Sequence, residues 1–183
     1  APFAFAEQYA AKQKAPEQTD KFKINFIHSY AASCGDIFID LEQQDPIPEN
    51  LLQQYASMGI KGVWVHAILY LLHPISGSEN LSAGYETRLK NLKSLIARCA
   101  KYGIGLYLYL NEPRGMPDSF YEHHPDWKGA AFSPNHVHAN CTSRKKPLEW
   151  LEDACHAVFR AAPGLAGAFL ITMSENLTHC HSK

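Results

Sequence analysis

Apolar residues along the chain repeat one unit: a short apolar run, a polar loop, an amphipathic stretch and a glycine-marked turn into the next run. The apolar runs predict strands at 22–30 (FKINFIHSY), 61–69 (KGVWVHAIL), 104–113 (IGLYLYLNEP) and 166–176 (AGAFLITMSEN). The amphipathic stretches predict helices at 48–59, 85–103 and 147–164. In the last helix we expect Pro147 at the first helical position and one apolar face formed by Leu148, Leu151, Cys155 and Val158.

Strands that alternate with helices predict an α/β fold, in which helices cover a parallel sheet. Two architectures satisfy this pattern. A doubly wound sheet would normally carry a glycine-rich phosphate loop after its first strand, and the loop HSYAASCGDIF has no such motif. A TIM-type barrel needs no such loop but uses eight strands and about 250 residues. With about four strands, the sequence predicts the first half of a (β/α) barrel over residues 21–183, preceded by a leader or linker at 1–20.

Composition narrows the classes of partner. The 183 residues are 46% hydrophobic with a formal charge of -1, which favours neither a nucleic-acid nor a membrane partner. No apolar run approaches the roughly 20 residues that a bilayer requires. Five cysteines without CxxC spacing favour free thiols in a reducing, cytoplasmic compartment and leave secretion open.

Every predicted strand ends in polar residues. Parallel strands bring these ends to one edge, where chemistry gathers in such folds, although a strand end is also where water begins. The residues concerned are His28, His66, Asn111, Glu112, Arg114, Glu175 and Asn176.

Among these, Glu175 follows the buried run AFLITMS, and partial desolvation would raise its carboxyl pKa and suit it to donate a proton. For Glu112, the alternative is an ion pair with Arg114 or a solvent-facing charge. Asn111 and Asn176 suit sugar hydroxyls, and they also suit turns.

The histidines leave three interpretations open. His28 and His66 fit metal ligands, substrate donors or satisfied core residues. The HVH (His136, His138) and HCH (His179, His181) spacings have no further cluster beside them, so we predict neither a metal nor a cofactor. Strand and loop aromatics, including Trp64, Tyr107 and Tyr109, fit stacking platforms for sugars or ordinary packing.

Three segments resemble the catalytic barrel of bacterial glycoside hydrolases, including uncharacterised glycosidase-like proteins, and more distantly the family-20 hexosaminidases. They are 51–69 (LLQQYASMGIKGVWVHAIL), 102–129 (YGIGLYLYLNEPRGMPDSFYEHHPDWKG) and 167–182 (GAFLITMSENLTHCHS). The resemblance implies that Glu175, at the tip of the fourth strand, is the general acid. The chain departs from the hexosaminidases at Ser174, where they have Asp. In the large superfamily of glycosidases with the acid on the fourth strand and the nucleophile on the seventh, Asn usually precedes the acid. In this chain Asn176 follows it.

We therefore predict a glycosidase fragment that hydrolyses O-glycosidic bonds, with Glu175 as acid and the other strand-end residues binding a carbohydrate substrate. The second carboxylate would lie beyond Lys183, and the fragment would then be inactive alone. It would be active if Glu112 supplies that carboxylate, or if two copies complete a barrel as a homodimer through unpaired sheet edges. The alternatives are a metal-dependent hydrolase using His28, His66 and Glu175, and a non-catalytic carbohydrate-binding barrel.

Overall fold

The computed structural model describes residues 24–171, except 34, 44 and 132–136. Its main sheet has four parallel strands in the order β1-β2-β3-β7. They are β1 (Phe26–Ile27), β2 (Gly62–Ala67), β3 (Gly105–Leu110) and β7 (Gly167–Leu170). The main helices are α2 (Glu49–Ser57), α4 (Tyr85–Lys101) and α6 (Lys145–Ala161). Consecutive strands are spatial neighbours, as in a barrel, so the predicted α/β class is confirmed.

One face of the sheet forms the main core. Side chains alternate between the two faces of a strand, and the alternate residues Val63, Val65, Leu106, Leu108 and Leu110 are almost completely buried. They belong to a cluster that includes helix residues Leu52, Leu92, Leu95 and Val158. The helices therefore cover this face, and the opposite face carries the remaining strand side chains.

The two junctions MGIKG and YGIGL have the same backbone geometry. Gly59 and Gly103 follow the ends of α2 and α4 with φ of 76° and 67°, a conformation that favours glycine. Beyond them, Ile60 N donates to Tyr55 O at 3.0 Å and Ile104 N donates to Cys99 O at 3.2 Å. Each junction thus satisfies carbonyls at the helix end and turns the chain into the next strand.

The predicted apolar face of the last helix is partly wrong. The helix begins at Lys145, two residues before Pro147, and Leu148 is 44% exposed. The buried side chains are Pro147, Ala154 and Val158. With 3.6 residues per turn, Leu148 lies about 100° around the helix from Pro147 and thus at the margin of the buried stripe.

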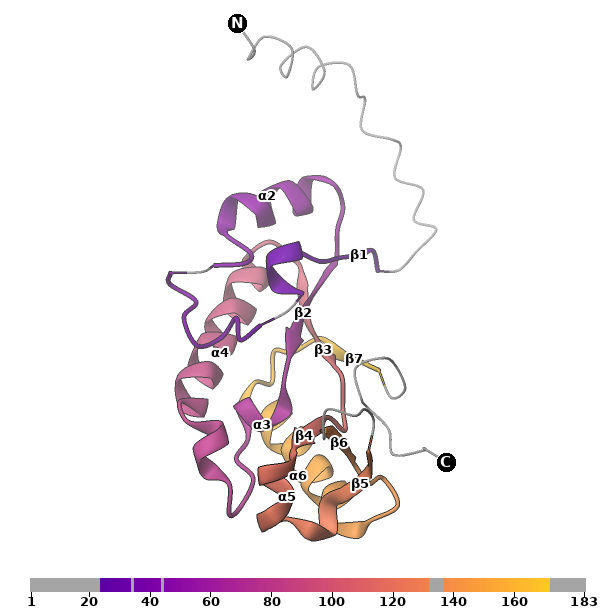
Figure 1. Cartoon of the computed structure of the whole chain (residues 1–183). Coiled ribbons are helices and arrows are strands. Elements are labelled where there is room, and N and C mark those ends of the chain that lie inside the picture. Colours follow the sequence, from indigo (N-terminus) through magenta and orange to yellow (C-terminus); the bar gives the residue numbers. More distant parts are fainter. Residues whose placement is uncertain (1–23, 34, 44, 132–136, 172–183) are drawn as a thin grey trace, which may run out of the picture.

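The loops after β2 and β3 carry additional structure that the sequence pattern did not predict. The first contains α3 (Leu69–Leu72) and the 3-10 helix η2 (Glu79–Ser82). The second contains β4 (Gly115–Pro117), α5 (Asp118–His123), the 3-10 helix η3 (Pro125–Trp127), β5 (Lys128–Ala131) and β6 (Val137–Asn140). The three strands form an antiparallel sheet in the order β4-β6-β5. In Figure 1 this sheet and α5 lie at the lower end of the molecule, beyond the carboxyl ends of β2 and β3.

These two loops share a second hydrophobic cluster. It consists of Ile75, Met116, Phe120, Tyr121 and Trp127, each at most 5% exposed. Tyr121 Oη also donates to His138 O at 2.7 Å, which ties α5 to β6. The loop structure therefore has a core of its own beside the carboxyl ends of the parallel strands.

The segment after β1 includes the 3-10 helix η1 (Tyr30–Ala32) and is held to α4 by ion pairs. Arg88 Nη2 lies 2.7 Å from Asp36 Oδ2, and the Arg98 guanidinium binds both oxygens of Asp45, at 2.5 and 2.8 Å. Bidentate pairing fixes the geometry as well as the charge. The segment thus lies against α4 and reaches the same end of the sheet as the other loops.

Candidate functional site

The strand-end residues gather at the carboxyl edge of the parallel sheet. His28 follows β1, His66 belongs to β2, and Asn111, Glu112 and Arg114 follow β3. Because all four strands are parallel and in register, these positions share one edge. Glu175 and Asn176 lie outside the described residues.

A row of aromatic rings crosses the open face of the sheet toward this edge. The His28 and Trp64 rings stack with centroids 4.3 Å apart, and the Trp64 and Tyr109 rings stack at 4.9 Å. Trp64 and Tyr109 are only partly buried, and His28 is exposed. The row therefore presents aromatic surface on three neighbouring strands, on the face that the helices do not cover.

A second group of rings lies on the same face of the sheet. Phe26 contacts Tyr107 edge-on at 4.8 Å and Phe169 at 5.1 Å between ring centroids. Glycine provides the room for this packing, since a Cβ atom on Gly62 would lie 2.6 Å from the Phe26 ring and one on Gly167 would lie 3.0 Å from Tyr107. Phe26, Tyr107 and Phe169 thus extend the aromatic surface of this face beside the row His28–Trp64–Tyr109.

Glu112 is a buried carboxyl group that joins two loops. Leu69 N donates to Oε1 and Arg114 N donates to Oε2, both at 3.1 Å, and the bond from Glu112 to Pro113 is cis. Burial raises the pKa of Glu112 to about 7, against the opposing effects of these two hydrogen bonds and the Arg114 charge. Because both oxygens accept from backbone N–H groups, Glu112 connects the start of α3 to the turn after β3.

Asn111 and Arg114 bring unsatisfied polar atoms to the edge. Asn111 Oδ1 and Arg114 Nη1 are buried and have no hydrogen-bond partner among the described residues. Buried polar atoms normally have partners, and a missing partner often marks a place for water or ligand. Together they offer one acceptor and one donor beside Glu112.

His66 is buried near the positive charge of Arg114. Its Nδ1 atom is 3.3 Å from Gly35 O, in the segment after β1. Burial lowers the pKa of His66, and the Arg114 charge acts in the same direction, whereas the Gly35 carbonyl opposes them. At neutral pH the imidazole is therefore neutral and able to donate one hydrogen bond and accept another.

Sequence reasoning did not identify three features that organise this edge. These are the Leu69 amide on Glu112, the Gly35 carbonyl beside His66, and the hydrogen bond of 2.7 Å between Ser78 Oγ and His124 Nε2. Each joins segments at least 31 residues apart in sequence. Two of the three use a backbone atom, which no side-chain motif reveals.

Within the described ranges, no group of three or more His, Cys, Asp or Glu residues is placed to hold a metal ion. The metal-hydrolase alternative used His28, His66 and Glu175, and Glu175 lies outside these ranges. Of the HVH pair, His136 is also outside, and His138 Nδ1 lies 2.8 Å from Asp118 Oδ1. His179 and His181 of the HCH pair are outside as well.

No helix in the described part of the chain combines the length and apolar character needed to cross a bilayer.

Two of the three cysteines described have a raised thiol pKa. Burial raises the pKa of Cys99 to about 11, and it raises that of Cys155 with a smaller contribution from the nearby Glu112 charge.

Taken together, the parallel strands, covering helices and polar carboxyl edge define part of a TIM-type (β/α) barrel. No protein-family model and no curated protein matches the sequence. Among solved structures, the fold is similar to the noncanonic maltogenic α-amylase AmyB from Thermotoga neapolitana, with a TM-score of 0.50 and 15% sequence identity. The similarity covers 80% of this chain and 38% of the amylase chain. At this identity the likeness concerns the fold alone, and the chain spans well under half of that amylase.

Proposed function

We propose that the chain forms the substrate-binding edge of a glycosidase barrel that hydrolyses O-glycosidic bonds, with Glu175 as the general acid. The observation that carries this proposal is the aromatic row His28–Trp64–Tyr109, which leads toward the edge that holds Asn111 and Arg114. A sugar ring offers C–H groups to an aromatic face and hydroxyls to polar groups. In this proposal the aromatic row is the platform for the C–H groups, and the buried, unpaired atoms of Asn111 and Arg114 are the partners for hydroxyls.

Each strand-end residue has a distinct part in this proposal. The amide oxygen of Asn111 accepts from a sugar hydroxyl, and the Arg114 guanidinium donates to another. The neutral His66 imidazole binds a further hydroxyl, as does Asn176, and His28 contributes its exposed ring to the row.

Glu112 has a positioning role in the proposed site. Its two oxygens already accept from Leu69 N and Arg114 N, so it holds Arg114 in place and is not free to attack a sugar. In the reaction, the Glu175 carboxyl protonates the glycosidic oxygen as its bond to the anomeric carbon breaks. Water then adds to that carbon and loses a proton, which restores the acid form of Glu175. We assign no described residue to the second carboxylate that such hydrolysis uses.

Association of two copies through the outer strands β1 and β7 stays a prediction.

The proposal is tested by hydrolysis of neutral glycosides with the Glu175→Gln variant. We expect the rate on oligosaccharides to fall by about 100-fold or more, because a positioned general acid contributes roughly 100- to 10,000-fold. The loss should be much smaller on a dinitrophenyl glycoside, whose leaving group needs little protonation. Glu42→Gln is the matched control, because Glu42 is exposed and lies after β1, outside the proposed site.

Turnover that survives Glu175→Gln on both substrates would remove Glu175 from the acid role.

The aromatic row also favours a second function, a carbohydrate-binding barrel without catalysis. That function predicts saturable binding of oligosaccharides with no hydrolysis by the unaltered protein.

A further inference from the structure

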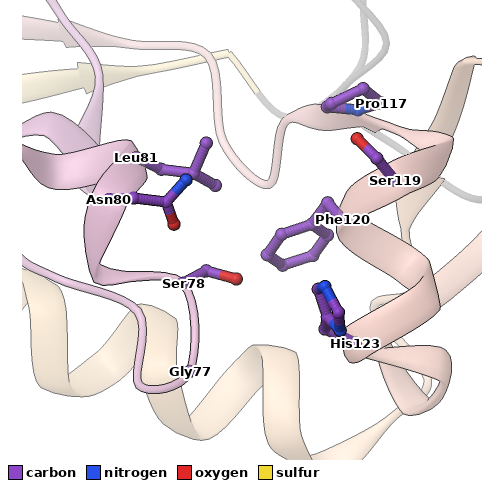
Figure 2. Close-up of a pocket in the computed structure, with 8 residues that line it drawn as sticks. All are labelled: Gly77, Ser78, Asn80, Leu81, Pro117, Ser119, Phe120 and His123. Carbon is purple, nitrogen blue, oxygen red and sulfur yellow. The ribbon is translucent and has the colours of Figure 1, made fainter.

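A cleft of about 250 Å³ opens between η2 and α5, apart from the aromatic row. Figure 2 shows its two sides, with Ser78, Asn80 and Leu81 facing Pro117, Ser119, Phe120 and His123. Gly77 completes the lining. The two sides belong to the loops after β2 and β3, so the cleft lies on the same side of the barrel as the strand ends.

The rim of this cleft carries polar side chains with free hydrogen-bonding capacity. Within the part of the chain that the structure describes, the side chains of Asn80, Ser119 and His123 make no hydrogen bond to protein groups, and all three are exposed. An amide, a hydroxyl and an imidazole each both donate and accept. The rim can therefore bind a ligand that also carries donors and acceptors.

A neighbouring cleft of about 350 Å³ differs in this respect. Several of its polar groups have protein partners: Trp150 Nε1 donates to Pro74 O at 3.1 Å, and Lys146 Nζ contacts Asp126 Oδ2 at 2.6 Å. His124, which also lines it, uses Nε2 on Ser78. This second cleft also carries the charged side chains of Lys146 and Glu149, whereas the lining of the cleft between η2 and α5 has no Lys, Arg, Asp or Glu.

The floor of the cleft is apolar and fixed in position. Phe120 is 4% exposed and its ring stacks on His124 with centroids 4.4 Å apart. The bond of 2.7 Å between Ser78 Oγ and His124 Nε2 joins this stack to the opposite loop. Because the floor is held from both sides, a ligand would meet a surface that needs little rearrangement.

We propose that this cleft binds one uncharged sugar unit, as an outlying part of the saccharide site. The inference rests on the proposed function, since it assigns the same class of substrate. The lining has no Lys, Arg, Asp or Glu, which disfavours a phosphate or other strongly charged ligand. Its volume corresponds to about eight water molecules at roughly 30 Å³ each, which suits a single ring and not a longer chain.

The test is a titration of the 183-residue chain with neutral trisaccharides, followed by amide NMR shifts. The panel contains maltotriose, cellotriose, chitotriose and xylotriose, with glucuronate as a charged comparison. We expect saturable shifts at Gly77, Asn80 and Ser119 with at least one neutral sugar, and weaker shifts with glucuronate. The double variant Asn80→Ala/Ser119→Ala should raise the Kd at the cleft about tenfold, from the loss of two hydrogen bonds.

Gln43→Ala/Ser143→Ala is the matched control, because it removes one amide and one hydroxyl from exposed positions elsewhere. Its Kd should equal that of the unaltered chain. The inference is overturned if no neutral sugar gives saturable shifts at the cleft, or if the double variant binds as tightly as the control.

Failure of the inference and failure of the proposed function have different signatures. If hydrolysis depends on Glu175 but the cleft residues show no shifts, the cleft inference alone is refuted. If no glycoside is hydrolysed but binding still depends on Asn80 and Ser119, the enzymatic proposal fails and the cleft remains a saccharide site.

Discussion

The buried carboxyl group of Glu112 should make folding less favourable as the pH rises from about 4.5 to about 7. Burial raises its pKa from an ordinary 4.5 to about 7 in the folded protein. Between these values the unfolded chain has lost the proton and the folded protein still holds it, so stability falls with rising pH. Below about 4.5 both states are protonated, and above about 7 both are ionised.

The size of this effect follows from the two pKa values. At 1.36 kcal/mol for each pKa unit, the change from 4.5 to about 7 corresponds to about 3 kcal/mol. Glu112→Gln removes the titration but keeps the shape of the side chain. Its single carbonyl oxygen can accept from Leu69 N or from Arg114 N, and the loss of one hydrogen bond costs about 1 kcal/mol.

Urea denaturation followed by tryptophan fluorescence measures the difference between the two proteins. At pH 4.5 Glu112→Gln should be less stable than the unaltered protein by about 1 kcal/mol, and at pH 8 it should be more stable by about 2 kcal/mol. Glu42→Gln, at an exposed position, is the matched control for replacing a carboxyl group by an amide. A difference for Glu112→Gln that stays constant between pH 4.5 and 8 would refute the argument that burial keeps this carboxyl protonated.

Two further substitutions test the open face of the sheet. Trp64→Ala removes the middle ring of the row between His28 and Tyr109, and we expect oligosaccharide binding to weaken by about 1 kcal/mol, or about fivefold in Kd by calorimetry. An unchanged Kd would exclude the row as a sugar platform. Gly62→Ala places a methyl group 2.6 Å from the Phe26 ring and should lower the free energy of unfolding by about 1 to 3 kcal/mol in urea. An unchanged midpoint would show that Phe26 moves aside at no cost.

The sequence predicted the parallel sheet and its main helices because each of those elements has a periodic apolar face. Leu106 and Leu108 alternate with Tyr107 and Tyr109, and the structure buries the leucines and leaves the tyrosines on the open face. The antiparallel sheet escaped prediction because its strands GMP, KGAA and VHAN contain no run of large apolar residues.

The candidate site was predictable only as a set of strand ends. The position of Glu112 after a buried strand indicated a place at the edge, but its partners could not be predicted. Leu69 lies 43 residues away and binds it through a backbone N–H, which any residue except proline could provide. One expected alternative for Glu112 was an ion pair with the Arg114 side chain. In the structure the backbone N–H of Arg114 donates the hydrogen bond to Glu112 instead.

The second hydrophobic cluster has a consequence for how this molecule could diversify. Ile75, Met116, Phe120, Tyr121 and Trp127 stabilise the loop structure, and Trp150 of α6 packs against both this cluster and the core beneath the parallel sheet. Substitutions on the outer surface of α5 or β5 therefore change what the molecule contacts without weakening the packing of β2 and β3. During evolution, sequence changes in these loops could alter ligand preference while the parallel sheet and its helices stay folded. Protein engineers could graft new loops at the same place.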